Sequence, residues 1–208
     1  MWAPERKAAC QASRRLRKSR APFRSQLIPN YMRKSMSVYA ITIACFAQML
    51  RSLTTLLTKG EERAQALEFE VQNLLDARLA PDMHTLARQV EFTCTQAQEA
   101  VCRLTQQALP QLATPANMRQ AKALIEDTLA MLASADRAVI DAGAERQVSI
   151  TLADGLSFDM TGQEYALNWA TPQFYFHLVT AYNILRHNGV PLGKAEYVQH
   201  MFAYARQP

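Results

Sequence analysis

Four long stretches of this 208-residue sequence repeat apolar residues at spacings of three and four. In the first, from 37 to about 59, the repeating positions are Val38, Ile41, Cys45, Met49, Leu53 and Leu56. The same period runs from about 81 to 108, from 116 to 134 and again after 161. This spacing puts the apolar side chains on one face of an α-helix. Because four one-sided helices must bury those faces against one another, the pattern predicts an all-α four-helix bundle.

Local signals set the expected helix boundaries in the first half of the chain. Gly60 follows a lysine at the end of the first periodic stretch, so we expect the first helix to end there. Residues 61–77 carry a shorter pattern and predict a short auxiliary helix. Pro81 suits the first turn of the next long helix, and Asp82 suits the positive end of its dipole.

A small β-hairpin is expected before the last helix. The segment QVSITLADGLSFDM contains two alternating runs joined by Asp154-Gly155, which is a strong hairpin signal. Thr161 and Glu164 then form a capping-box pattern that predicts the start of the last helix. Pro172 lies inside that helix, where it removes an amide donor, so we expect a kink there.

The positive charge of the chain is concentrated at its beginning. Residues 1–34 hold ten Lys or Arg and one acid, whereas the rest holds 13 basic and 17 acidic side chains. We therefore predict a disordered basic extension over 1–35, a folded domain over 36–194 and a tail over 195–208 with a short helix. Nucleic-acid binding is not expected of the folded domain, because its net charge is −4.

The basic extension leaves three interpretations open. It is poor in acids and rich in arginine, as organellar targeting sequences are, which would apply in a eukaryotic source. It is also a candidate arm for nucleic acid or an anionic membrane. The third interpretation is upstream sequence outside the functional domain, because ordered periodicity begins at Met36.

Cysteine usage and hydropathy favour a cytoplasmic protein. The four cysteines form no C-x-x-C pair, and three of them follow apolar helix faces. This distribution favours reduced thiols over a disulfide framework. No apolar run approaches the length of about 18 residues that a membrane span requires, so none is predicted.

Two segments, LLDARLAPDMHTLARQV and FYFHLVTAYNILRHNGVPLGK, carry a family resemblance. They resemble the signature segments of an uncharacterised bacterial and fungal domain family within the DinB/YfiT-like superfamily. The resemblance covers about residues 36–194 and implies an up-down-down-up four-helix bundle, often a homodimer. In better-studied relatives, three histidines at one end of the bundle hold a divalent metal. Some of those relatives transfer or rearrange thiol-linked substrates.

The resemblance transfers only one of these three histidines. His177 falls where the second histidine of the last helix lies in metal-binding relatives. Gln173 occupies the first position, and Gln89 lies near the depth of the remaining ligand. A divalent metal at His177, whether Zn, Ni, Mn or Fe, would therefore need ligands from other helices, the candidates being Asp82, His84 and Glu91.

The favoured function is small-molecule binding in a polar pocket at one end of the bundle. The expected lining is His177, Gln173, Gln89, Asp82 and Tyr182. One alternative is a metal-dependent or thiol-transferase enzyme like the superfamily relatives, and another is a non-catalytic dimerisation or interaction module. Whether the protein is an enzyme stays open. His84 and His200 are expected at the surface.

Overall fold

The computed structural model describes residues 37–206, which belong to a compact unit that begins at Ser37. The extension predicted over residues 1–35 lies outside the described residues. Four long helices dominate the described unit: α2 (Cys45–Ala66), α4 (Leu86–Thr105), α5 (Met118–Ser134) and α8 (Thr171–His187). Each corresponds to one of the four stretches with a helical apolar period, so the all-α prediction is confirmed.

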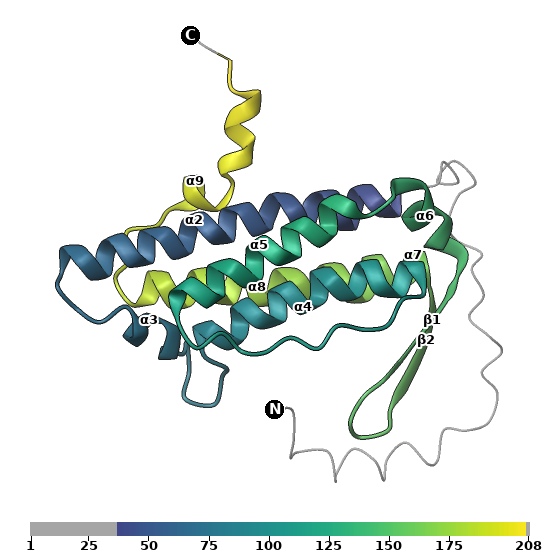
Figure 1. The fold of residues 1–208 in the computed structure, drawn as a ribbon, viewed down its shortest axis with the longest axis horizontal. Helices are drawn as coiled ribbons and strands as arrows, with labels where there is room; N and C mark the ends of the chain where they lie inside the picture. Colours follow the sequence, from purple (N-terminus) through teal and green to yellow (C-terminus); the bar gives the residue numbers. More distant parts are fainter. Residues whose placement is uncertain (1–36, 207–208) are drawn as a thin grey trace, which may run out of the picture. The chain divides into compact units, whose positions relative to one another are not determined.

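The four helices form an up-down-down-up bundle (Figure 1). α2 and α8 run in one direction and α4 and α5 in the other. The connection from 106 to 117 travels back along the bundle, which allows α4 and α5 to be parallel. α2 contacts α5 and α8, and α4 contacts the same two helices. Each helix thus buries its apolar face against two neighbours.

The prediction that Gly60 ends the first helix is wrong. α2 continues to Ala66 and is preceded by a π-helical turn, η3 (Ala40–Ala44). A Cβ atom at Gly60 would lie 3.2 Å from Leu185 Cδ2 and 3.3 Å from Leu74 Cδ1. The glycine therefore permits close packing inside a helix instead of ending it. The auxiliary helix is correspondingly shorter than predicted and spans only α3 (Gln72–Asp76).

The predicted start of the second long helix at Pro81 is also wrong. α4 begins at Leu86, after Thr85 has adopted the extended conformation of an N-cap. The Thr85 hydroxyl accepts a hydrogen bond from the Arg88 amide at 3.3 Å. This cap satisfies an amide that has no partner within the helix, and it fixes the helix start at Leu86, five residues beyond Pro81.

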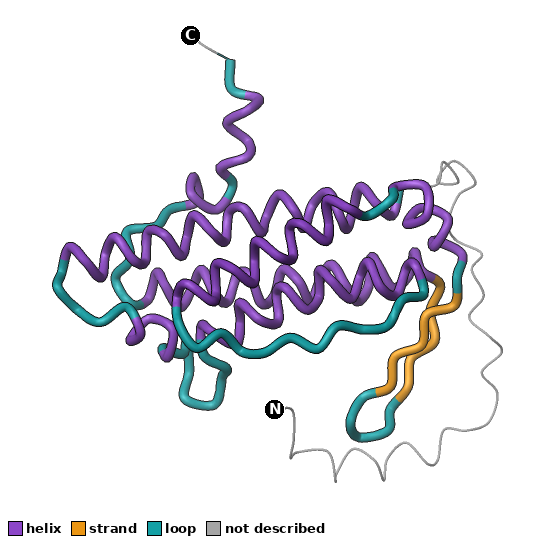
Figure 2. The backbone as a smooth tube through the Cα atoms, in the orientation of Figure 1, coloured by secondary structure: helices purple, strands orange, loops and turns teal. Residues whose placement is uncertain are grey.

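The predicted hairpin is confirmed at the end of the bundle where the last helix begins (Figure 2). Gly155 in its loop has φ +83°, a conformation that glycine adopts without strain. A short helix that the sequence analysis did not predict precedes the hairpin; Asp136 caps it by accepting from two backbone amides. The elements of this region are α6 (Arg137–Ala142), η4 (Gly143–Glu145), β1 (Gln147–Thr151) and β2 (Ser157–Thr161).

The last helix begins as the capping box predicts. Thr161 and Glu164 exchange both hydrogen bonds of the motif at the start of α7 (Gly162–Tyr165). A π-helical turn, η5 (Ala166–Ala170), joins α7 to α8 just before Pro172. The interruption expected at Pro172 is thus a π-helical turn, which changes the phase of the helix while the helix continues.

The interior is apolar and continuous across the four helices. Phe46 of α2 stacks on Phe174 of α8 with ring centroids 4.1 Å apart. The helix Ala40–Ala66 is long and apolar enough to cross a membrane, but half of its most apolar window is buried. Such burial against other helices is typical of a core helix.

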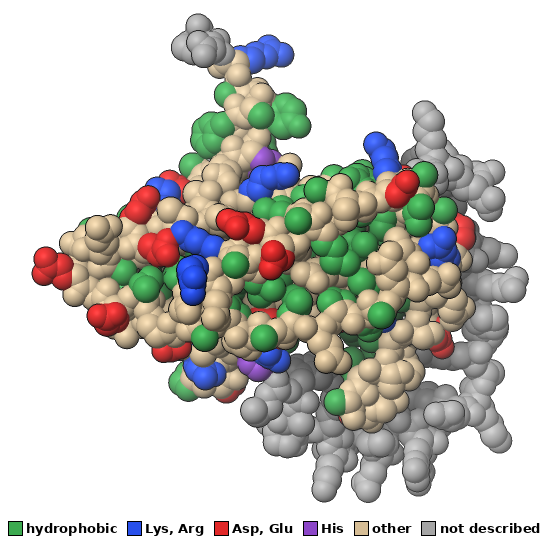
Figure 3. Space-filling view, viewed as in Figure 1, with side chains coloured by type: hydrophobic (Ala, Val, Ile, Leu, Met, Phe, Trp, Pro, Cys, Tyr) green, Lys and Arg blue, Asp and Glu red, His purple; other side chains and the backbone are tan. Residues whose placement is uncertain are grey.

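The chain leaves the bundle after α8 through a left-handed glycine and two short helices. Gly189 has φ +82°, and the segment continues as α9 (Lys194–Tyr197) and η6 (Gln199–Tyr204). The short helix predicted in the tail is therefore present. Apolar side chains are exposed along η6 (Figure 3), namely Met201, Phe202 and Tyr204.

Candidate functional site

His177 and Gln89 form a hydrogen-bonded pair between α8 and α4. The distance from His177 Nδ1 to Gln89 Oε1 is 2.8 Å. The Gln89 amide nitrogen donates to the backbone carbonyl of His84 at 3.5 Å, so the amide oxygen faces the histidine. Nδ1 is therefore the donor, and Nε2 of the neutral ring carries a lone pair.

Burial, the larger cause, and the nearby charge of His84 together lower the pKa of His177 to about 4. Removing water from around the ring disfavours the imidazolium form. His177 is consequently neutral near pH 7. A neutral imidazole with one nitrogen donating and the other accepting can orient a ligand or take up a proton.

Aromatic rings surround this polar pair. The His177 ring lies 4.8 Å from the Phe92 ring and 5.3 Å from the Phe176 ring, centroid to centroid. The Phe92 and His84 rings pack edge to face with centroids 5.1 Å apart. The Arg88 guanidinium lies over the Phe92 ring, 4.4 Å from its centroid. We use the name His177 site for these residues: His177, Gln89, His84, Phe92 and Phe176.

Sequence reasoning found His177 and Gln89 but missed Phe92 and Phe176. Phe92 lies three positions after Gln89, which puts both side chains on one face of α4. That spacing was the available signal. His84 is partly exposed, in keeping with the expectation of a surface residue, but its ring also contacts Phe92.

Of the other predicted site residues, Gln173 shares the helix face of His177, whereas Asp82 and Tyr182 do not. Gln173 precedes His177 by four residues on α8 and is half-buried on the same face. Asp82 is exposed in the loop before α4. Tyr182 packs its ring against Tyr197 at 5.9 Å, and its five-residue offset from His177 turns it about 140° around the helix. The contacts thus join His177 to Gln89 and direct Tyr182 toward α9.

The buried carboxylate nearest to this region is already paired. Arg88 Nη1 lies 2.6 Å from both Glu91 carboxylate oxygens and 3.0 Å from the Thr114 hydroxyl. Thr114 also donates to Glu91. This cluster attaches the 106–117 connection to α4, and it occupies the Glu91 carboxylate.

The residues around His177 do not fit the three-histidine metal centre that the resemblance implies. Across residues 37–206, no group of three His, Cys, Asp or Glu side chains is placed to hold an ion. Nδ1 of His177 is bonded to an amide, and its other close neighbours are aromatic. A transition-metal site needs about three such ligands, so we derive no chemical step through a metal.

The described cysteines are poor nucleophiles. Cys45, Cys94 and Cys102 are free thiols. Burial raises the pKa of Cys94 to about 12, and it raises the pKa of Cys45 and of Cys102 as well. All three are therefore protonated near pH 7, where the thiolate is the reactive form.

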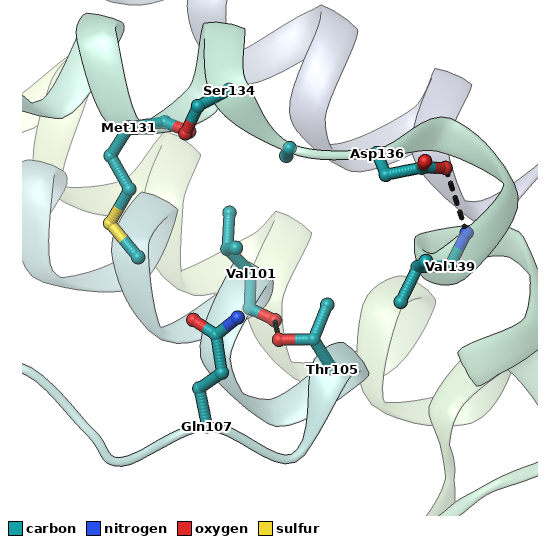
Figure 4. Close-up of a pocket in the computed structure, with 8 residues that line it drawn as sticks. Val101, Thr105, Gln107, Met131, Ser134, Asp136 and Val139 are labelled. Carbon is teal, nitrogen blue, oxygen red and sulfur yellow. Dashed lines mark hydrogen bonds between the residues drawn. The ribbon is translucent and has the colours of Figure 1, made fainter.

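Several hollows in residues 37–206 lie outside the His177 site. One of about 230 Å³ lies between α4, α5 and the start of α6 (Figure 4), with Val101, Met131 and Val139 on its walls. Another of about 400 Å³ lies between α2 and η6. We call it the α2 hollow; its lining is Ala44, Gln48, Arg51, Gln199 and His200.

Comparison with known proteins agrees with the fold and with the two signature segments. A family model described as "Domain of unknown function (DUF1993)" matches residues 38–198. The crystal structure of a DinB family member protein from Shewanella denitrificans is 33% identical, with a TM-score of 0.71, over 82% of this chain and 93% of that chain. No curated protein matches the chain. The chain therefore belongs to the DUF1993 family, an uncharacterised family of the DinB-like superfamily.

Proposed function

We propose that this protein binds a small molecule at the His177 site, near the end of the bundle where α4 begins. The observation that carries the proposal is the 2.8 Å hydrogen bond from His177 to Gln89. This bond fixes the tautomer and the orientation of a neutral imidazole, and it leaves Nε2 as an acceptor for an incoming group.

The surroundings support a neutral ligand that has an apolar body and a hydrogen-bond donor. A hydroxyl or N–H group would donate to Nε2 of His177, while Phe92 and Phe176 would contact the apolar part. The Arg88 guanidinium already lies over the Phe92 ring, so that face of the ring is not available to a cationic ligand. Gln173 and Asp82 would give the ligand further polar contacts. Tyr182 would contact the ligand least, since its ring packs against Tyr197.

Ligand-observed NMR with a library of neutral fragments tests this proposal. We expect fragments with one donor and an aromatic or aliphatic body to bind the wild-type protein and to lose binding in His177→Ala. His187→Ala is the matched control, because it removes an exposed histidine from the same helix. If His177→Ala retains the same fragments with the same affinities, the proposal fails. Fragments that do bind then guide assays for turnover.

We also propose that the outer face of α8 pairs with a second copy of the chain. From Tyr165 to Leu185 the sequence contains no Asp, Glu, Lys or Arg, although Leu167, Phe176 and Val179 are exposed. Depletion of charge around exposed apolar side chains is typical of a protein interface. An isologous pairing of two copies would bury this face on both.

The oligomeric state tests the pairing. Sedimentation should give a dimer for the wild-type chain and a monomer for Val179→Lys, because the new ammonium group would be buried without a partner. Leu109→Lys is the control, since Leu109 is an exposed apolar residue away from α8. A wild-type monomer at all concentrations would contradict the proposal.

A cytoplasmic location forms part of the same proposal. It is supported by the three free thiols of the described residues, of which Cys94 and Cys102 are buried. Free cysteines are usual where the environment is reducing. Fractionation of cells from the source organism is the direct measurement.

A further inference from the structure

The α2 hollow collects polar side chains from two parts of the chain. Ala44, Gln48 and Arg51 follow one another at spacings of four and three, so they share a face of the helix that η3 and α2 form. Gln199 and His200 face them from η6. The volume of about 400 Å³ is within the range of small-molecule sites.

The groups that line this hollow are cationic or able to donate hydrogen bonds. Among the described residues, no carboxylate forms an ion pair with Arg51, and none lines the hollow. The Gln199 side-chain oxygen accepts from the Thr55 hydroxyl at 3.1 Å, which leaves its NH₂ group free to donate. Gln48 contributes a second amide.

His200 adds an unexplained polar atom. Its Nδ1 is buried and has no hydrogen-bond partner among residues 37–206. Five other side-chain atoms of the described residues share this condition, and an ordered water or ion is one explanation for such an atom. His200 lies at the surface, as expected, but it is partly buried and lines the α2 hollow.

Glu196, the acid closest in sequence to Gln199, is held by other groups. Glu196 lies one residue before Tyr197, where its carboxylate accepts from the Gly193 amide at 2.8 Å and pairs with Lys59 at 3.9 Å. The negative charge of Glu196 is thus balanced by the Gly193 amide and the Lys59 ammonium group. Among residues 37–206, no carboxylate pairs with Arg51, which is exposed.

The 230 Å³ hollow in Figure 4 shows the opposite condition. Its Thr105 hydroxyl donates to the Val101 carbonyl at 2.8 Å, and its Asp136 carboxylate accepts from the Val139 amide at 3.2 Å. Those polar groups are already used, so little remains to recognise a ligand. The α2 hollow differs because its donors are unused.

We infer that the α2 hollow binds a small molecule bearing a phosphate group. The planar guanidinium of Arg51 matches two phosphate oxygens, and the amides of Gln48 and Gln199 and the ring of His200 would donate to the others. The volume leaves room for an organic group attached to the phosphate. The α2 hollow shares no residue with the His177 site, so phosphate binding there is tested independently of ligand binding at His177.

Isothermal titration of the full chain with inorganic phosphate at low ionic strength tests the inference. We expect a Kd below about 1 mM, weakened about tenfold or more by Arg51→Gln and to a smaller extent by His200→Leu. Arg186→Gln is the control for loss of one exposed charge, and it should bind as the wild type does. Circular dichroism verifies that each variant is folded.

Three ligands in parallel define the chemistry of the site. Glycerol phosphate that binds more tightly than inorganic phosphate would support a phosphomonoester ligand, and the reverse order would support free phosphate. Acetate should bind much more weakly than either. Equal binding of acetate, or phosphate binding that Arg51→Gln leaves unchanged, would overturn the inference.

Discussion

The His177 site and the α2 hollow differ in how many of their polar groups have a hydrogen-bond partner in the protein. At the His177 site, the imidazole, the amide and the nearby carboxylate are each bonded to another protein group. In the α2 hollow, Arg51 and the Nδ1 atom of His200 have no such partner among the described residues. The first arrangement leaves one ring atom, Nε2 of His177, to accept from a ligand, whereas the second leaves several donors without a protein partner among the described residues.

The two sites also differ in their relation to the family domain. The whole His177 site lies inside residues 38–198, the part that the family model matches. Gln199 and His200 lie just beyond that part. The comparison teaches that the signature segments mark a packed polar pair, while the larger hollow depends on residues at the edge of the domain.

The largest expected difference concerns the two glutamines. Gln89→Leu should lower the free energy of unfolding by about 2–3 kcal/mol, because the buried His177 ring nitrogen would lose its acceptor. Gln199→Leu should lower it by less than about 0.5 kcal/mol, since its amide is near solvent. Urea denaturation of both variants measures the contrast. If both variants lose the same free energy of unfolding, Gln89 is no more important to the folded state than Gln199, which contradicts the contrast.

A second contrast appears in the pH dependence of stability. The pKa of His177 is lowered from 6.5 to about 4 in the folded state, so the unfolded chain takes up this proton first. Stability should therefore fall as the pH drops from 6.5 toward 4, by up to about 3 kcal/mol from this residue.

His177→Gln isolates that contribution. The variant should lose part of the decline between pH 6.5 and 4, and a smaller part should remain, because burial lowers the pKa of His84 as well. His200→Gln serves as the comparison from the α2 hollow. Identical stability profiles for the wild type and His177→Gln would contradict the assignment of a neutral imidazole.

The smallest expected effect is that of chelation. Because the His177 site offers one imidazole in an amide and aromatic setting, EDTA should shift the Tm by less than about 1 °C. Elemental analysis of untagged protein beside His177→Ala completes the measurement. A stoichiometric amount of Zn, Ni, Mn or Fe that disappears in the variant would restore the metal-dependent mechanism of the superfamily relatives.

Much of the fold was predictable, because periodicity and capping act locally. The apolar period located all four long helices, and Thr161 with Glu164 located the start of the last one. Gly60 was misread, since its role depends on Leu74 and Leu185, which are distant in sequence. The start of α4 was misplaced because Thr85, a less conspicuous residue than Pro81, supplies the cap.

The candidate site was predictable only in part. Gln89 was identified by the depth at which the resemblance places a ligand, and its bond to His177 agrees with that depth. The α2 hollow was missed because no sequence pattern connects the outer face of α2 to η6, a 3₁₀ helix near the end of the chain. Pairing of such segments is a tertiary property.

The crossing connection has a consequence for how the molecule could be divided. Gln106, Gln107 and Leu109 are exposed, whereas Thr114 farther along is attached to Arg88 and Glu91. A protease cut near Gln107 would produce two fragments, one with α2 and α4 and the other with α5 and α8. Because α2 packs on α5 and α4 on α8, the fragments would stay together and could reassemble after separate expression. The protein is thus suited to a split-protein reporter in which neither half carries a complete core.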